Sequence, residues 1–237
     1  MIVYGRNPVR EALRGRRRVL RAWAAAGVGF DWPAGIDVQR AGAGRLEEIC
    51  GSPEHQGVCA EAEPYPYADA DGLLASDDAL VVCLDQVQDP HNLGAVCRVA
   101  EAAGAAGVVI PERRAVEVTP AVCKASAGAV EHLPVARVRN VADWLAAAKE
   151  TGAWVYGASA DARVTYDQPD WGGRAVLVLG SEGEGIRPRV AAACDELVAL
   201  PMDGRVESLN VSTAAAALLY GVRLLRAGRD LASRPNP

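Results

Sequence analysis

Short apolar runs alternate with longer amphipathic segments along most of this chain of 237 residues. An uninterrupted apolar run predicts a strand that is covered on both faces, because each of its side chains must then be buried. Such runs lie at residues 80–84, 108–110, 153–158, 175–179 and 197–200. Residues 135–138 are also expected to form a strand, although Arg137 interrupts their apolar character. Helical patterns lie at residues 91–103, 119–128, 141–149 and 209–225. This alternation predicts an α/β fold with a mostly parallel sheet and helices on both faces.

A smaller α/β unit is predicted for the first 62 residues. Asn7 and Pro8 are expected to open a helix that runs to about Arg14, since proline suits the first helical turn. Strands are expected at 19–25 and 58–60, with a short helix at 45–50. Prolines soon after residue 62 interrupt regular structure. We therefore expect domains at 1–62 and 79–228, a linker at 63–78 and a tail at 229–237.

The charge of the chain is unevenly distributed. The formal net charge is −5, but seven arginines crowd the start of the chain, opposed there only by Glu11. They are Arg6, Arg10, Arg14, Arg16, Arg17, Arg18 and Arg21. Screening confines an electrostatic field to roughly 10 Å, so a basic patch can coexist with an acidic total. The cluster predicts either contact with RNA or a solvated helix face in an arginine-rich chain.

The spacing of the cysteines and histidines argues against a metal site. The six cysteines form no CxxC pair, and the three histidines show no zinc spacing, so we expect no bound metal. Cys83 and Cys97 lie in apolar segments and are expected to be small core residues. We find no signal peptide and no apolar run of transmembrane length. Free thiols without an export signal predict a reducing cytoplasm.

Three short blocks place polar or small residues where predicted strands end. They are residues 92–98 (NLGAVCR), residues 179–186 (LGSEGEGI), and residues 200–202 (LPM) with 208–210 (SLN). In an open α/β sheet, ligands bind outside the carboxyl ends of the strands, so we expect the blocks to share one crevice. Plainer readings are an amide at a helix start for Asn92, a surface arginine for Arg98 and a helix N-cap for Ser208.

The glycine-rich block predicts a turn that a ligand can approach closely, because its backbone N–H groups are exposed. Its spacing differs from the dinucleotide fingerprint G-x-G-x-x-G, which argues against a dehydrogenase. Glu182 and Glu184 would repel a pyrophosphate, so a neutral or cationic ligand such as S-adenosylmethionine fits better. A simple tight turn is the plainer alternative.

In this order, the blocks resemble the three motifs of the SpoU (TrmH-type) RNA ribose 2'-O-methyltransferases. The resemblance covers about residues 80–227 and implies S-adenosylmethionine as cofactor, a homodimer and a C-terminal trefoil knot. It implies a catalytic set of Asn92, Arg98, Glu182, Ser208 and Asn210. It implies cofactor contacts, largely through backbone groups, from Leu179, Gly180, Gly183, Ile186, Leu200, Met202, Ser208 and Leu209.

The start of the chain resembles the small L7Ae/L30-like RNA-binding domain of the ribosomal branch of this family. The resemblance rests on residues 4–13 (YGRNPVREAL) and 55–58 (HQGV), and it is closest to the RlmB type, which methylates a guanosine of 23S rRNA. It implies RNA contacts from Arg6, Arg10, Arg16, Arg17, Arg18 and His55, although residues 55–57 are equally typical of a chain turn. Alternatives are a tRNA or antibiotic-resistance rRNA methyltransferase, or a non-catalytic ribosome-assembly protein, which would be expected to lack Arg98, Glu182 or Asn210.

The implied reaction is an in-line displacement by a ribose 2'-hydroxyl at a methyl group on a sulfonium. Positioning alone can contribute roughly 7–11 kcal/mol, so no covalent intermediate is needed. The guanidinium of Arg98 stays charged at any working pH, and we therefore expect it to bind phosphate and stabilise developing alkoxide charge. The RNA phosphate, a water molecule or Glu182 would then accept the proton.

Overall fold

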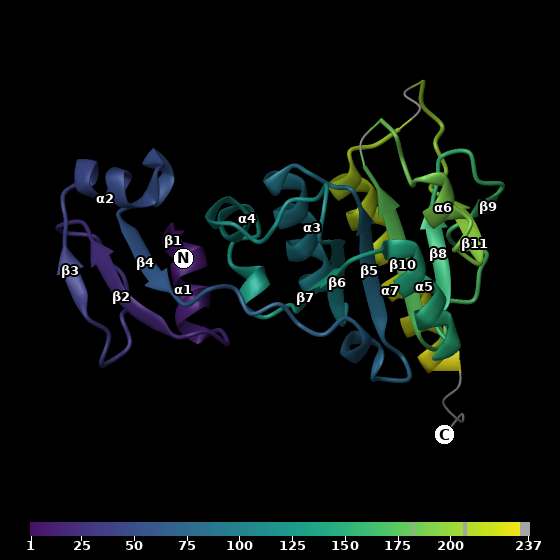
Figure 1. The fold of residues 1–237 in the computed structure, drawn as a ribbon, viewed down its shortest axis with the longest axis horizontal. Helices are drawn as coiled ribbons and strands as arrows, with labels where there is room; N and C mark the ends of the chain where they lie inside the picture. The colour runs from purple at the N-terminus through teal and green to yellow at the C-terminus, as the bar shows by residue number, and fades with distance from the viewer. Residues whose placement is uncertain (182, 206–207, 233–237) are drawn as a thin grey trace.

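The chain builds two β-sheets that lie next to each other along the long axis of the molecule (Figure 1). The computed structural model describes residues 1–181, 183–205 and 208–232, without the side chains of the last four. The sheet orders are β1-β4-β2-β3 in the smaller unit and β7-β6-β5-β10-β8-β11-β9 in the larger one. All strand pairs of the larger sheet among the described residues are parallel, which confirms the predicted α/β architecture.

The smaller unit contains strands that are too short for a hydrophobic pattern to reveal. Its elements are β1 (Ile2–Tyr4), α1 (Arg6–Arg14), β2 (Val19–Ala24), β3 (Val38–Arg40), α2 (Ala43–Cys50), the 3-10 turn η1 (Pro53–His55) and β4 (Val58–Ala62). The three-residue strands β1 and β3 were not predicted. β4 pairs antiparallel with β1 and β2, while β2 and β3 run parallel.

The larger unit follows its apolar pattern closely. Its first elements are η2 (Asp71–Leu74), β5 (Leu80–Asp85), α3 (Pro90–Ala103), β6 (Gly107–Pro111), α4 (Pro120–Ala125), η3 (Ala129–Glu131), β7 (Val135–Val138) and α5 (Val141–Glu150). The rest are β8 (Trp154–Ala158), β9 (Val164–Thr165), β10 (Ala175–Gly180), α6 (Pro188–Ala191), β11 (Glu196–Ala199) and α7 (Val211–Ala232).

Several elements of the larger unit depart from the prediction. The helix expected at 119–128 ends at Ala125, and a 3-10 turn follows it. β9 and α6 are too short to show a period and were not predicted. Helix α7 runs to Ala232, so the first part of the expected tail at 229–237 is helical; residues 233–237 lie outside the described part of the chain.

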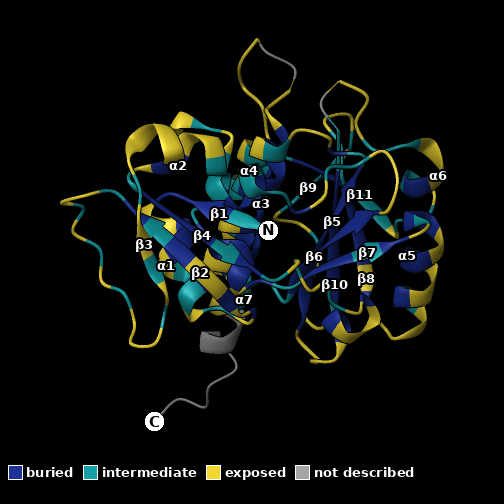
Figure 2. Ribbon diagram, turned by 60° about the vertical axis from the view of Figure 1, so that its left-hand side comes forward, coloured by how far each residue is buried: buried dark blue, intermediate teal, exposed yellow. Residues whose placement is uncertain are grey.

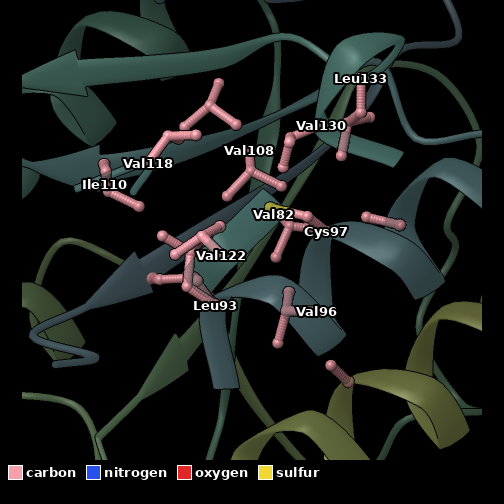
Figure 3. Close-up of a cluster of buried hydrophobic side chains, with 14 of the residues drawn as sticks. Val82, Leu93, Val96, Cys97, Val108, Ile110, Val118, Val122, Val130 and Leu133 are labelled. Atoms are coloured by element: carbon pink, nitrogen blue, oxygen red, sulfur yellow. The ribbon is translucent and has the colours of Figure 1, made fainter. Parts of the chain in front are cut away.

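The central strands contribute side chains to two hydrophobic cores. Every residue of β5 is buried, and so are most residues of β6, β7, β8 and β10 (Figure 2). Alternate residues point to opposite faces of a sheet. Val82 therefore packs in the core shared with α3, α4 and α7, whereas Val81 packs in the core shared with α5. Figure 3 shows side chains of α3, α4, β5 and β6 gathered in the first of these cores.

The segment expected as a linker, residues 63–78, is packed onto the larger unit. The Tyr65 hydroxyl donates to the carbonyls of Val130 and Leu133, at 3.1 and 3.2 Å. Leu73 and Leu74 are buried in the core beside α5. The connection therefore contributes to the packing of the larger unit.

The two units meet in a tightly packed joint. Arg17, in the turn before β2, forms a two-pronged ion pair with Glu131 of η3, with N–O distances of 2.9 and 2.6 Å. Only 2% of the Arg17 side chain and 1% of the Glu131 side chain are exposed. A Cβ on Gly128 would lie 2.6 Å from Cβ of Glu11, so the backbones approach closely there. Arg17 therefore holds the units together, and its expected role as an RNA contact is corrected.

No helix among the described residues has both the length and the apolar character that a membrane span requires.

Candidate active site

The three blocks come together at the carboxyl end of the larger sheet. β5 and β10 lie side by side at its centre, and their last residues, Asp85 and Gly180, are paired in register (Figure 1). A cavity of about 350 Å³ opens beyond this edge. It is lined by Gln86, Val87, Gln88, Asp89, Asn92, Ser181, Glu184 and Val211. The expectation of a shared crevice is thus met by residues from the first two blocks and by the residue that follows the third.

A hydrogen bond joins the first block to the third. The Asn210 side chain donates from Nδ2 to Oδ1 of Asn92, at 3.1 Å. Its Oδ1 accepts from the backbone N–H of Ser212 at 2.8 Å and thereby caps helix α7. The cap orients the amide of Asn210, because its oxygen must face the helix and its nitrogen then faces Asn92. Asn210, rather than Ser208, is the N-cap residue.

The glycine-rich turn folds back on its own first residue. Ser181 and Gly185 exchange two backbone hydrogen bonds, of 3.2 and 3.0 Å. A Cβ on Gly180 would lie 2.0 Å from the carbonyl carbon of Gly185, a distance that no side chain tolerates. Gly183 and Gly185 have φ values of +85° and +66°. Glycine is required at Gly180 by this close approach and is favoured at the other two by their left-handed conformation.

A buried carboxylate beneath the turn was not predicted. Asp85 is fully buried, and its carboxylate accepts the backbone N–H of Arg187 at 2.9 Å. The Arg187 side chain adds contacts to the same carboxylate, from Nε at 2.9 Å and from its terminal nitrogen at 2.6 Å. A single charged residue at the end of the apolar run 80–84 was the signal in the sequence that could have revealed it.

Gln86 adds a second unforeseen feature to the cavity. It follows β5 directly and has a φ of +64°, a region in which residues other than glycine are uncommon. Such a conformation persists only where the surrounding structure imposes it. This strained residue lines the cavity and lies between Asp85 and the start of α3.

The other predicted residues are placed around this edge with different exposure. Arg98 is exposed on α3, about 9 Å along the helix axis from Asn92, and does not line the cavity. Leu179 is buried in the core, so only its backbone is available to a ligand. Ile186 and Leu200 are partly buried and pack against the two cores, whereas Met202, Ser208 and Leu209 are exposed. Glu182 lies outside the described residues.

The cysteine of the first block is a core residue. Cys97 is fully buried in the core beside α3, as expected, and this burial raises the pKa of its thiol to about 12. A thiol with this pKa is protonated near neutral pH and does not supply a thiolate nucleophile. The described residues also contain no group of three or more His, Cys, Asp or Glu side chains suited to hold a metal ion.

The predicted RNA-contacting residues separate into exposed and buried ones. Arg6, Arg10, Arg16 and Arg18 are exposed on the smaller unit. His55 is buried, and its Nδ1 accepts the backbone N–H of Gly57 at 3.0 Å. The structure thus favours the chain-turning interpretation of residues 55–57 and corrects the assignment of His55 to RNA.

A larger hollow, of about 690 Å³, lies at the end of β7 and is lined in part by Arg137, Arg139 and Trp144. It contains none of the three blocks. The smaller cavity is the better candidate site, because the residues predicted from separate parts of the chain converge there.

Comparison with known protein families identifies the family of this chain. Residues 79–220 match the SpoU rRNA Methylase family, and residues 2–68 match a family described as RNA 2'-O ribose methyltransferase substrate binding. Two relatives bear names of the TrmH tRNA/rRNA methyltransferase family. YacO of Bacillus subtilis is 41% identical over 93% of this chain and 94% of its own. A Staphylococcus haemolyticus protein is 38% identical over 94% of each chain.

Solved structures show the same likeness. The SpoU methyltransferase AviRb from Streptomyces viridochromogenes, in complex with AdoMet, matches with a TM-score of 0.80 at 26% identity, over 96% of this chain and 90% of AviRb. The TrmH/SpoU tRNA modifying enzyme of A. aeolicus matches with a TM-score of 0.59 at 25% identity, over 70% of this chain and 84% of that enzyme. With a family match over more than half of its length and a relative as similar as YacO, this chain belongs to the SpoU/TrmH family of RNA methyltransferases.

Proposed function

We propose that this protein transfers a methyl group from S-adenosylmethionine to a ribose 2'-hydroxyl of RNA, and that its substrate is a guanosine of 23S rRNA. One observation carries the proposal: the Asn210–Asn92 hydrogen bond and the cavity beside it unite the motif residues of distant segments at one sheet edge. The smaller unit packs against the larger one and carries exposed arginines that offer a surface for RNA.

The residues at this edge fit the proposed cofactor. Among the described residues that line the cavity, the charged ones are Asp89 and Glu184, both carboxylates that favour a cationic ligand. Gly183 and Gly185 are exposed, and open space lies where their Cβ atoms would be, so a ligand can approach the backbone of the turn closely there. When bound, S-adenosylmethionine supplies a methyl group that is activated by its sulfonium. We assign its binding to Gly180, Leu200 and Leu209, largely through their backbones.

The chain's own polar groups would orient the ribose and stabilise charge. Asn92 and Asn210 form a fixed pair of amides at the edge of the cavity, and the helix cap holds one of them in orientation. Arg98 is exposed and carries a permanent positive charge, which suits a phosphate next to the target ribose. Its charge would also stabilise the alkoxide that develops as the hydroxyl loses its proton.

A ribosomal substrate is favoured by the match over the smaller unit. The tRNA-modifying enzyme of A. aeolicus covers 70% of this chain, whereas AviRb covers 96%. The first 62 residues carry the exposed arginines, which could bind RNA phosphates. Because tRNA enzymes of this family usually lack this unit, we propose that it recruits ribosomal RNA. We further propose that this unit is L7Ae/L30-like.

The proposal includes a homodimer and a trefoil knot. Tyr220 and Leu224 are 43% and 71% exposed, and their spacing of four residues places these apolar side chains on one face of α7. An apolar face of this kind is typical of an interaction surface. The knot is proposed because the three motif blocks resemble those of the SpoU methyltransferases.

Two measurements test the function. Calorimetric titration with S-adenosylhomocysteine should show binding that survives EDTA. Mapping of 2'-O-methyl groups in RNA from a deletion strain should reveal one missing guanosine methylation in 23S rRNA, restored by the wild-type gene. No binding at millimolar ligand would overturn the cofactor assignment. Loss of a tRNA methylation instead of an rRNA methylation would identify tRNA as the substrate.

A further inference from the structure

We propose that the Asp85–Arg187 pair is a positioning device that holds the glycine-rich turn in the conformation that binds S-adenosylmethionine. This inference rests on the proposed function and adds two residues to it. Neither residue is among the motif positions described above. Both act through the turn, so they are positioning residues rather than catalytic ones.

Asp85 controls both ends of the turn. Its backbone is paired in register with Gly180, where the turn begins. Its carboxylate accepts the backbone N–H of Arg187, where the turn ends, at 2.9 Å. The two ends are thus fastened to one residue of a strand that is buried throughout.

The interior of the turn depends on this anchorage. The paired hydrogen bonds between Ser181 and Gly185 close the turn, and Gly185 lies against Gly180. Shifts at Arg187 would therefore be transmitted to Gly185 within two residues. A turn held in its binding conformation before the ligand arrives avoids the entropic cost of ordering it on binding.

The buried carboxylate also explains why Arg187 is required. Asp85 is fully buried, and a buried charge is stable only when paired and hydrogen-bonded. The Arg187 guanidinium supplies the opposite charge at 2.6 Å, yet 39% of its side chain remains exposed. The pair therefore fixes the turn from below and leaves its outer side accessible to a ligand.

Asp85→Asn tests this role with little change of shape. An amide nitrogen in place of one carboxylate oxygen cannot accept the N–H groups of Arg187, so the end of the turn should loosen. We expect faster hydrogen exchange in the 180–187 peptide of the ligand-free protein and about tenfold weaker S-adenosylhomocysteine binding. The KM for S-adenosylmethionine should rise similarly, while kcat at saturating cofactor stays within about twofold.

Asp143→Asn is the matched control. Asp143 pairs with Arg189, two residues beyond Arg187, but both side chains are largely exposed. An exposed pair of this kind contributes little, so the turn and the affinity should be unchanged. Arg187→Ala should behave like Asp85→Asn, and Arg187→Lys should recover part of the affinity by restoring the charge.

The arginine variants keep the test decisive if Asp85→Asn does not fold. Normal exchange and normal affinity in Arg187→Ala, or equal losses in Asp143→Asn, would overturn the inference and leave the proposed function intact. A wild-type protein that failed to bind S-adenosylhomocysteine would overturn both.

Discussion

The joint between the two units and the turn above the sheet each depend on a buried carboxylate that is paired with arginine. In the joint, Glu131 and Arg17 are both enclosed by protein. Beneath the turn, Asp85 is enclosed but Arg187 remains partly open to solvent. The same chemical pair therefore serves two purposes: a fully enclosed pair fixes one unit against another, and a half-open pair supports a loop that a ligand must reach.

The largest effect is expected from breaking the enclosed pair. Arg17→Ala would leave Glu131 buried without its partner, which typically costs about 3–5 kcal/mol. Urea denaturation should show this loss in the free energy of unfolding. Arg18→Ala is the control, because Arg18 faces solvent and pairs with Glu63 at 3.5 Å. Equal stability of the two variants would contradict the assignment of Arg17 to the joint.

Replacing the exposed Arg98 should lower the rate of methyl transfer but leave the stability of the protein nearly unchanged. Arg98→Ala removes a charge-stabilising donor, and such a loss typically lowers the rate by about 10²–10³-fold. Because Arg98 is exposed, the midpoint of thermal unfolding and the affinity for S-adenosylhomocysteine should change little. Single-turnover methylation of an rRNA fragment measures the effect. Near-normal turnover would remove Arg98 from the catalytic set.

Asn210 separates structural from chemical roles within one side chain. Asn210→Ala removes the cap of α7, at a cost of about 1 kcal/mol, together with the bond to Asn92. Asn210→Asp keeps an oxygen for the cap but cannot donate to Asn92, so turnover should fall several-fold while thermal stability is retained. If the aspartate variant kept full activity, capping alone would explain the residue.

The smallest effect concerns the exposed arginines, in contrast with the buried one. If Arg10 and Arg18 each contact a phosphate, replacing both with alanine should reduce the salt slope of RNA affinity by up to about 1.4. Arg45→Ala, an exposed arginine paired with Glu48 in α2, serves as control. An unchanged slope in the double variant would place the RNA path elsewhere on the smaller unit.

Local patterns predicted the elements that are long enough to show a period. β10 lies at Ala175–Gly180, where the apolar run 175–179 predicts it, because each residue of that run must fit a sheet covered on both sides. β9, with two residues, and α6, with four, carry no such pattern. The limit is therefore set by length, since a period needs several residues to be recognised.

The candidate site was predictable to the extent that strand ends converge. The turn at Gly180 and the amides of Asn92 and Asn210 could be placed at one edge, because the carboxyl ends of parallel strands share it. The sequence left open whether Ser208 or Asn210 caps the last helix, and the structure assigns the cap to Asn210. The sequence analysis also grouped Arg17 with the exposed Arg16 and Arg18, because the sequence alone does not show which of several adjacent arginines is buried.

By itself, the sequence determined the fold class, the order of the longer elements and the motif residues, because these depend on neighbours within a few positions. Only the tertiary structure decided which distant residues pair. Asp85 meets Arg187 across 102 positions, Arg17 meets Glu131 across 114, and Asn92 meets Asn210 across 118. Such pairs arise from the route of the chain through the sheet, and each requires a buried charge or an oriented amide to find one specific partner.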